Sequence, residues 1–251
     1  MPEPGIRVLP IKGIPEIHPG DNLGTILAEA LQQGGIRVAE SDVFVIAQKI
    51  VSKAEGRIVQ LDSVKASEKA RHWADEYRKD ERLVELALQE SRRIIRMERG
   101  VLIVETRHGF VCANAGVDAS NTPPGTATLL PEDPDRTARE LAAEFSTTFG
   151  VPIAVIISDT FGRPWREGLT NVAIGVAGIA PLIDYRGQRD SSNRPLQATV
   201  IALADELASA AELVMGKLNG VPAAVVQGFQ YRSREGSGRN LLRAPDQDLF
   251  R

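Results

Sequence analysis

Cysteine is nearly absent from this chain, which has one, Cys112, among 251 residues. A single cysteine excludes an intrachain disulfide and any metal site built only from cysteine, and it suits a reducing compartment such as the cytoplasm. Histidine is almost as scarce. His18, His72 and His108 lack the spacing of metal ligands, so we expect core, turn or surface roles for all three.

Long apolar runs are also missing. The N-terminal segment has too short an apolar run for a signal peptide. The longest nearly apolar stretch, Val172 to Ile183, is shorter than a bilayer span. A formal net charge of -3 gives no general attraction to nucleic acid or to anionic lipid. We therefore expect a soluble, cytoplasmic protein with neither of these partners.

The usual sequence signatures of nucleotide and hydrolase sites are missing as well. The chain has no GxxxxGKS/T loop and no GxGxxG after a strand, and the segment GSGRN at 236–240 is too weak to count. No GxSxG supports a hydrolase serine. These absences argue against the P-loop and Rossmann classes, but they leave nucleotide binding by another fold open.

Apolar runs and helical patterns alternate along the chain, and no repeat interrupts them. We expect strands at 6–11, 43–47, 101–106, 110–117, 151–158 and 221–229. We expect helices from a cap at Asp21 to Gln33, over 67–97 with a break at Asp80, from Pro134 to Gly150, and over about 195–218. The segment 121–135 is the most loop-like. This order predicts an α/β or α+β fold with a mixed sheet, in one domain over 1–251 whose two lobes meet near 121–135.

Two acidic residues follow apolar strands. Asp159 comes after the apolar run 151–158, and open α/β sheets bind ligands at such strand ends. The neighbouring hydroxyl of Thr160 offers a second hard oxygen to Mg²⁺ or Mn²⁺. Asp118 follows the strand at 110–117, beside small residues and the amide of Asn121. Either acid alone could simply start a turn; together they favour a shared metal and phosphate site.

Two lysines could supply the cations of a phosphate site. Lys49 and Lys53 follow the strand at 43–47 and stand four residues apart. On a helical turn this spacing puts both side chains on one face, and lysine is an effective point charge for phosphate. The alternative is a solvated pair at the surface.

Several linked motifs resemble those of the coenzyme F420-0:L-glutamate ligase family, whose members attach glutamate to a deazaflavin coenzyme. The resemblance covers nearly the whole chain, and the order and spacing of its motifs are highly specific. The motifs read GIPEIHPGDNL, AQKIVSKAEGR, HGFVCANAGVDASN, ISDTFGRPWREGLTNVAIG and ELVMGKLNGVP. In some relatives a nitroreductase-like domain follows. This chain resembles the stand-alone form.

The resemblance implies a two-lobed, mixed-sheet ligase fold and a homodimer whose sheets extend across the subunit interface. It also implies a reaction in which GTP phosphorylates a carboxylate of coenzyme F420-0. The amine of L-glutamate then displaces phosphate from the acyl phosphate, which leaves an amide, GDP and phosphate; later additions are γ-linked. The alternatives are a nucleotide-dependent ligase acting on another carboxylate and a non-catalytic nucleotide-binding protein.

The same resemblance implies roles for individual residues. Divalent metal, Mg²⁺ or Mn²⁺, is expected at Asp118, Asp159 and Thr160, with K⁺ as an additional cation. Asp118, Asp159, Lys49 and Lys53 are the expected catalytic residues. The nucleotide is expected to contact Gly13, Ile14, Pro15, Glu16, Gln48, Lys49, Lys53, Asn121, Met215, Gly216, Lys217, Leu218, Asn219, Gly220, Val221 and Pro222. Arg163 and Arg166 are expected to meet the anionic substrate.

One position departs from the family pattern. In archaeal members a glutamine in the segment that matches 215–222 helps to bind a second metal, and Lys217 stands there in this chain. An ammonium group cannot ligate a cation. Either the second metal is held differently, or Lys217 contacts a phosphate directly.

Overall fold

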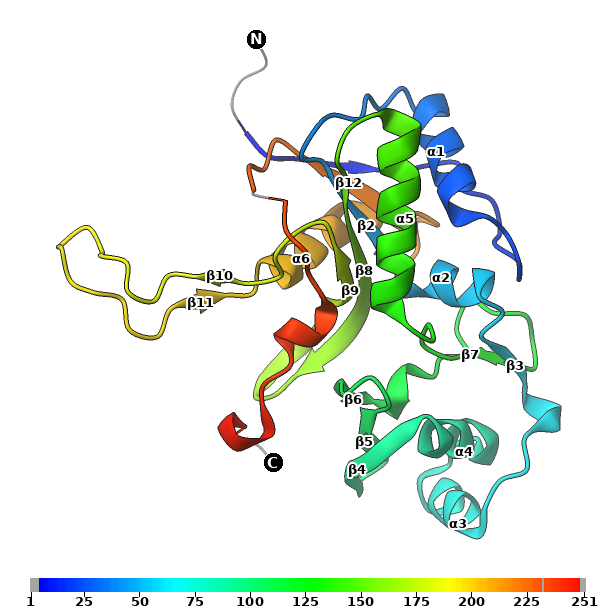
Figure 1. The fold of residues 1–251 in the computed structure, drawn as a ribbon. Coiled ribbons are helices and arrows are strands. Elements are labelled where there is room, and N and C mark those ends of the chain that lie inside the picture. Colours follow the sequence, from blue (N-terminus) through cyan, green and yellow to red (C-terminus); the bar gives the residue numbers. More distant parts are fainter. Residues whose placement is uncertain (1–4, 232, 249–251) are drawn as a thin grey trace.

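A five-stranded mixed sheet runs through the middle of the computed structural model, which describes residues 5–231 and 233–248 (Figure 1). The strand order is β1-β12-β2-β8-β9. The strands are β1 (Arg7–Pro10), β12 (Ala223–Gln227), β2 (Val43–Ala47), β8 (Ala154–Arg163) and β9 (Arg166–Ala177). Only β2 and β8 run parallel; the other neighbours are antiparallel. The prediction of a mixed α/β fold is therefore confirmed.

Alternating side chains of the central strands build two separate cores. Phe44 and Ile46 of β2 pack on one face of the sheet with helices α1 (Leu23–Gln33) and α5 (Pro134–Phe149). Val43 and Val45 point to the other face and pack against α6 (Leu203–Met215). A strand buried on both faces reads as an unbroken apolar run, and this is how β2 was recognised in the sequence.

Helix boundaries follow local capping chemistry. α5 begins with Pro134 in its first turn and ends at Gly150, whose φ of 69° lies in the left-handed region, as predicted. The predicted cap of α1 at Asp21 is wrong by one residue. The side chain of Asn22 accepts the hydrogen bond from the Thr25 amide, while the Asp21 carboxylate accepts one from the His18 amide.

A smaller group of elements lies at one end of the central sheet, in the lower part of Figure 1. It contains a three-stranded sheet, order β4-β5-β6, and a two-stranded sheet, β3-β7. Its elements are β3 (Ile58–Gln60), the short 3₁₀ turn Leu61–Ser63, α3 (Glu68–Tyr77), α4 (Glu81–Gln89), β4 (Ser91–Glu98), β5 (Val101–Thr106), β6 (Val111–Ala113), the 3₁₀ turn Asn114–Gly116 and β7 (Thr126–Thr128). Trp73, Val84, Leu102 and Val104 form its main core.

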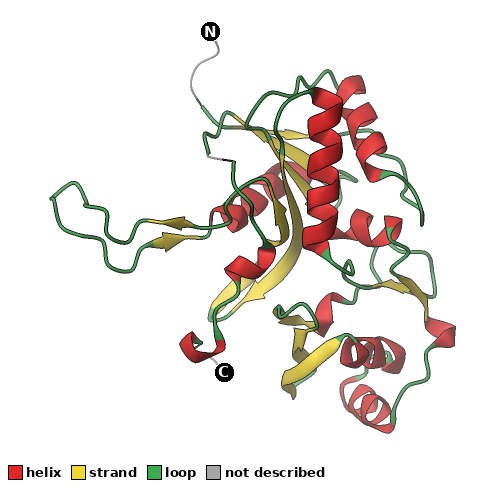
Figure 2. Ribbon diagram, in the orientation of Figure 1, coloured by secondary structure: helices red, strands yellow, loops and turns green. Residues whose placement is uncertain are grey.

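Four predicted elements are wrong in part. The strand expected at 110–117 is shorter, because β6 ends at Ala113 and the 3₁₀ turn Asn114–Gly116 follows it. Asp80 does divide two helices, as the cap of α4, but the second half of 67–97 includes strand β4, because Ile94 and its neighbours pair with β5. The 121–135 segment is not all loop, since it contains β7. The stretch before α6 is not helical: β11 (Val200–Ile201) pairs there with β10 (Ile183–Asp184), and together they form an arm that extends away from the sheet (Figures 1 and 2).

The most consequential correction concerns Asp159. The strand that we expected to end at Ser158 continues to Arg163 and turns at Pro164 and Trp165 into β9, so Asp159 lies within a long hairpin. Its register shifts between Ile157 and Ser158, and such irregularities change the direction of side chains next to ligand sites. Helix α2 (Gln48–Ala54) follows β2 directly. The C-terminal part contains two 3₁₀ turns, Gly238–Leu241 and Pro245–Gln247. None of the helices in 5–231 and 233–248 is long and apolar enough to cross a membrane.

Candidate active site

A cavity of about 1140 Å³ opens where β2 ends and β8 runs past it. Five parts of the chain line it: the loop after β1, the start of α2, the loop after β6, the β8–β9 hairpin, and the end of α6 with the segment that follows. Most of the predicted site residues lie together in its wall. They are Ile14, Pro15, Glu16, Gln48, Lys49, Lys53, Asp118, Asn121, Asp159, Thr160, Met215, Gly216, Lys217, Leu218, Gly220, Val221 and Pro222.

Four predicted residues are not part of this wall. Gly13 and Asn219 adjoin lining residues without lining the cavity themselves. Arg163 and Arg166 are exposed at the end of the β8–β9 hairpin, beyond Leu169, which does line the cavity. The Arg163 guanidinium donates a hydrogen bond to the carbonyl of Glu167, 2.7 Å away, and so braces the hairpin end.

Lys49 and Asp118 form one corner of the cavity. The Lys49 ammonium lies 2.5 Å from the Asp118 carboxylate and also donates to the carbonyl of Ser120 at 2.7 Å. The amide and hydroxyl of Ser120 both donate to Asp118, each at 2.7 Å. Burial alone would raise the pKa of Asp118, but the bonds from Lys49 and Ser120 outweigh it and hold that pKa below its ordinary value. Asp118 is therefore an anion fixed in position.

Backbone pairing anchors this corner. Asp118 and Thr128 exchange backbone hydrogen bonds of 3.1 and 2.8 Å, which tie the loop after β6 to the end of β7. Lys49 and Lys53 were expected to lie four residues apart on one face of a helix, and both belong to α2. The Lys53 ammonium is buried, with 8% of its side chain exposed, and lies 2.5 Å from the carboxylate of Glu16. Lys49, Lys53 and the loop that carries Asp118 thus line the same side of the cavity.

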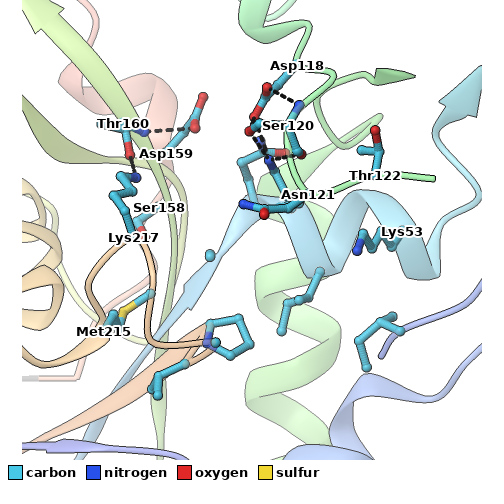
Figure 3. Close-up of a pocket in the computed structure, with 18 of the residues that line it drawn as sticks. Lys53, Asp118, Ser120, Asn121, Thr122, Ser158, Asp159, Thr160, Met215 and Lys217 are labelled. Carbon is cyan, nitrogen blue, oxygen red and sulfur yellow. Dashed lines mark hydrogen bonds and ion pairs between the residues drawn. The ribbon is translucent and has the colours of Figure 1, made fainter. Parts of the chain in front are cut away.

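Asp159 lies on the opposite side of the cavity (Figure 3). Its carboxylate accepts a hydrogen bond from the Thr160 amide at 2.8 Å. Burial raises the pKa of Asp159 to about 6, and the negative charge of Asp118 adds to this rise, while Lys217 and Gln48 oppose it. The two carboxylates therefore influence each other, and a cation placed near both would relieve the cost of burying Asp159.

A second cluster of polar side chains lines the wall beside Asp159. The Lys217 ammonium donates a hydrogen bond to the hydroxyl of Thr160, as Figure 3 shows. The Thr160 hydroxyl donates to the side-chain oxygen of Asn171 at 2.7 Å. The Asn171 amide nitrogen in turn donates to Glu212 at 2.9 Å, and the other carboxylate oxygen of Glu212 lies 3.9 Å from the Lys217 ammonium. These four side chains close a ring of contacts.

A glycine turn brings Lys217 to this place. Gly216 ends α6 with a φ of 61°, a left-handed value that glycine adopts without strain. A Cβ atom added there would lie 2.6 Å from the side-chain nitrogen of Asn219. The chain then returns to β12 through Pro222, whose carbonyl accepts a hydrogen bond from the Ala47 amide at 2.8 Å. The 216–222 segment is thereby held against the end of β2.

Comparison with known proteins identifies the family of the chain. The sequence model described as F420-0:gamma-glutamyl ligase matches residues 12–228. The chain belongs to the F420-0:gamma-glutamyl ligase family. It is 46% identical over 250 residues to the coenzyme F420:L-glutamate ligase of Methanothermobacter thermautotrophicus, covering 98% of this chain and 99% of that relative. The enzyme of the same name from Methanopyrus kandleri is 45% identical over 253 residues, covering 99% of this chain and 98% of that relative.

A more distant relative supports the same family. The coenzyme F420:L-glutamate ligase of Methanocaldococcus jannaschii is 40% identical over 215 residues, which is 85% of this chain and 86% of that relative. The resemblance inferred from the motifs is confirmed. The roles of single residues within the family site remain predictions.

Our sequence analysis missed Ser120, Asn171 and Glu212. All three line the cavity and bind predicted site residues. Each lies inside a motif of the ligase family: Ser120 two residues after Asp118, Asn171 in the β9 part of the hairpin, and Glu212 at the start of ELVMGKLNGVP. No local pattern links Asn171 to Glu212, since 41 residues separate them. The family motifs include these three residues, but only the structure shows which side chains they bind.

The donor set for a metal is sparse. Within the described part of the chain, no three His, Cys, Asp or Glu side chains form a group that could hold a metal ion. Asp118 and Asp159 nevertheless offer hard carboxylate oxygens from two walls of one cavity, and Mg²⁺ commonly binds through one or two carboxylates together with phosphate oxygens and water. These two residues fit the divalent metal that the ligase family implies. The Thr160 hydroxyl is already bonded to Asn171 and Lys217.

Proposed function

We propose that this chain ligates L-glutamate to coenzyme F420-0 and uses GTP to activate the acceptor carboxylate. Family membership supports the activity. The observation that carries the mechanism is the convergence of Lys49, Lys53, Asp118 and Asp159 on one cavity large enough for a nucleotide and part of an acceptor. Their charges suit a reaction that moves a phosphoryl group between anions.

The first step makes an acyl phosphate. A carboxylate oxygen of coenzyme F420-0 attacks the γ-phosphorus of GTP, the new O–P bond forms, and the bond to the bridging oxygen breaks so that GDP leaves. Lys49 and Lys53 bind phosphate oxygens and offset the charge that accumulates during transfer. Asp118 and Asp159 would hold a divalent metal, Mg²⁺ or Mn²⁺, which would neutralise phosphate charge. K⁺ is an additional cation in this proposal.

The second step forms the amide. The amine nitrogen of glutamate attacks the acyl carbon, the C–N bond forms, the C–O bond to phosphate breaks, and the amine proton is released. A free carboxylate is a poor acyl donor, so the cavity must hold both reactants in line and exclude water from the acyl phosphate. The loop at 14–16 and the 215–222 segment lie along the nucleotide in this proposal. Arg163 and Arg166 meet the anionic part of the acceptor outside the cavity.

We also propose a homodimer and the division of the single domain 1–251 into two lobes near 121–135. The β10–β11 arm supports a dimer because it extends away from the rest of the chain in Figure 1. Analytical ultracentrifugation would measure the subunit number. A monomer at micromolar concentration would contradict the dimer and leave the proposed reaction unaffected.

A coupled assay tests the reaction itself. Purified protein is supplied with GTP, Mn²⁺, L-glutamate and coenzyme F420-0, and GDP release and product mass are measured. We expect GDP release to require both the acceptor and glutamate, with a product heavier by one or more glutamyl residues. ATP is expected to support a much lower rate. GDP release without acceptor, or binding of GTP without turnover, would contradict the proposal.

A further inference from the structure

The ring formed by Lys217, Thr160, Asn171 and Glu212 combines side chains from four places in the sequence around one positive charge. Thr160 comes from β8, Asn171 from β9 and Glu212 from α6, while Lys217 lies just beyond the end of α6. The three hydrogen bonds run in one direction, from Lys217 through Thr160 and Asn171 to Glu212. The ammonium donates to the Thr160 hydroxyl, that hydroxyl donates to the Asn171 oxygen, and the Asn171 amide donates to the Glu212 carboxylate.

These hydrogen bonds leave the Thr160 hydroxyl with only one acceptor position for a metal ion. A hydroxyl has one hydrogen and two acceptor positions. The hydrogen points to Asn171, and the ammonium of Lys217 takes one acceptor position. A divalent cation on the remaining position would share the oxygen with the ammonium, so two positive centres would repel each other from within a few ångströms.

We propose that the Lys217 ammonium is the resident cation of this wall and excludes a divalent metal from Thr160. The divalent metal of the active site is then bound by the Asp118 and Asp159 carboxylates without Thr160. Glu212 acts as a positioning residue, because its carboxylate lies 3.9 Å from the ammonium and orients Asn171.

The exposed Lys217 ammonium can bind an anion. Its side chain is 62% exposed and lines the cavity, so the ammonium has N–H groups left for an anion beside its bond to Thr160. The chemistry fits a phosphate oxygen of a nucleotide. Only this identification of the anion rests on the proposed function; the exclusion of metal from Thr160 does not.

Titration with Mn²⁺ alone tests the exclusion. Free Mn²⁺ is followed by electron paramagnetic resonance as it is added to the unaltered protein and to Lys217→Gln, which removes the charge and supplies an oxygen. We expect Lys217→Gln to bind one more Mn²⁺ per chain than the unaltered protein. Lys79→Gln is the matched control, since Lys79 is exposed in the smaller group of elements, and it should bind as the unaltered protein does. Equal numbers in Lys217→Gln and the unaltered protein would overturn the proposal.

A second substitution asks whether the additional ion uses Thr160. Thr160→Val keeps the shape of the side chain and removes the hydroxyl. In the otherwise unaltered protein we expect no change in Mn²⁺ binding, while in the Lys217→Gln background the additional ion should be lost. A loss of Mn²⁺ from the single Thr160→Val variant would also overturn the proposal, even if Lys217→Gln failed to fold. Neither titration measures ligation, so a failure here is distinct from a failure of the proposed reaction.

Discussion

The central sheet and the smaller group of elements beside it are built in different ways. All residues of β12 are buried, and β2 has one residue that is not fully buried. In β4, by contrast, exposed and half-buried residues alternate irregularly, and no residue is fully buried. Exposed arginines on β4, Arg92 and Arg93, pair with the buried carboxylate of Glu105. The central sheet is therefore the more deeply buried of the two regions.

The cavity depends on both regions. Asp159 belongs to the central sheet, while Asp118 follows the small three-stranded sheet and is tied to β7. Lys49, at the start of α2, joins them because it binds Asp118 and extends from the end of β2. The two carboxylates of the site are therefore supplied by different regions of the molecule. The following substitutions separate the contributions of the two regions.

The largest effect is expected in the core of the central sheet. Phe44 is fully buried, and its ring centroid lies 4.7 Å from that of Phe145. Phe44→Ala leaves a large cavity and should lower the free energy of unfolding by about 3–5 kcal/mol. Urea unfolding followed by circular dichroism measures this change. Val101→Ala, at a 47% exposed position in the smaller group, serves as the comparison and should cost less than about 0.5 kcal/mol. Similar losses in both variants would contradict the contrast in burial between the two positions.

The next effect concerns the two carboxylates. Asp118→Asn and Asp159→Asn should each lower kcat/KM by roughly 10²–10³, as expected for the loss of an electrostatic stabiliser. If both regions supply one metal, the double variant should fall little below the worse single variant, because groups that act as a unit are not additive. Steady-state rates at limiting Mn²⁺ decide this. Asp62→Asn, 95% exposed, is the control and should keep full activity. Additive losses would indicate separate roles for the two carboxylates.

In the central sheet, β1, β2 and β12 were predicted close to their observed bounds, while β9 was not expected as a strand. β2 was predicted with both of its ends, because an apolar, β-branched run is flanked by Asp42 and Gln48. β4 was mistaken for helix, since charges interrupt its apolar residues and its pairing with β5 is irregular. Gly162, Pro164 and Gly168 are residue types typical of a loop, yet pairing with β9 continues β8 to Arg163. Hairpin pairing with the following strand overrode local preference in both cases.

The candidate site shows the same limit. Local patterns identified Asp118 and Asp159 as acids next to strands, and Lys49 and Lys53 as neighbours on a helix. They gave no reason for Lys49 to meet Asp118, 69 residues away, and family resemblance supplied that connection. The ring around Lys217 joins residues up to 57 positions apart, and neither patterns nor resemblance predicted it.

The smallest effect is expected at a helix cap in the smaller group. The Asp80 side chain caps α4 and accepts hydrogen bonds from the amide and guanidinium of Arg82; the Arg82 side chain holds the pKa of Asp80 below its ordinary value of 3.8. Asp80→Ala should lower the free energy of unfolding by about 1 kcal/mol at pH 7. A depressed folded pKa gives stability that is complete above the unfolded pKa and is lost as pH falls through the folded value. The difference from the unaltered protein, measured by urea unfolding, should therefore shrink below about pH 4. Activity per folded molecule should stay within twofold, because Asp80 is outside the cavity wall; a larger loss would mean that α4 controls the position of Asp118.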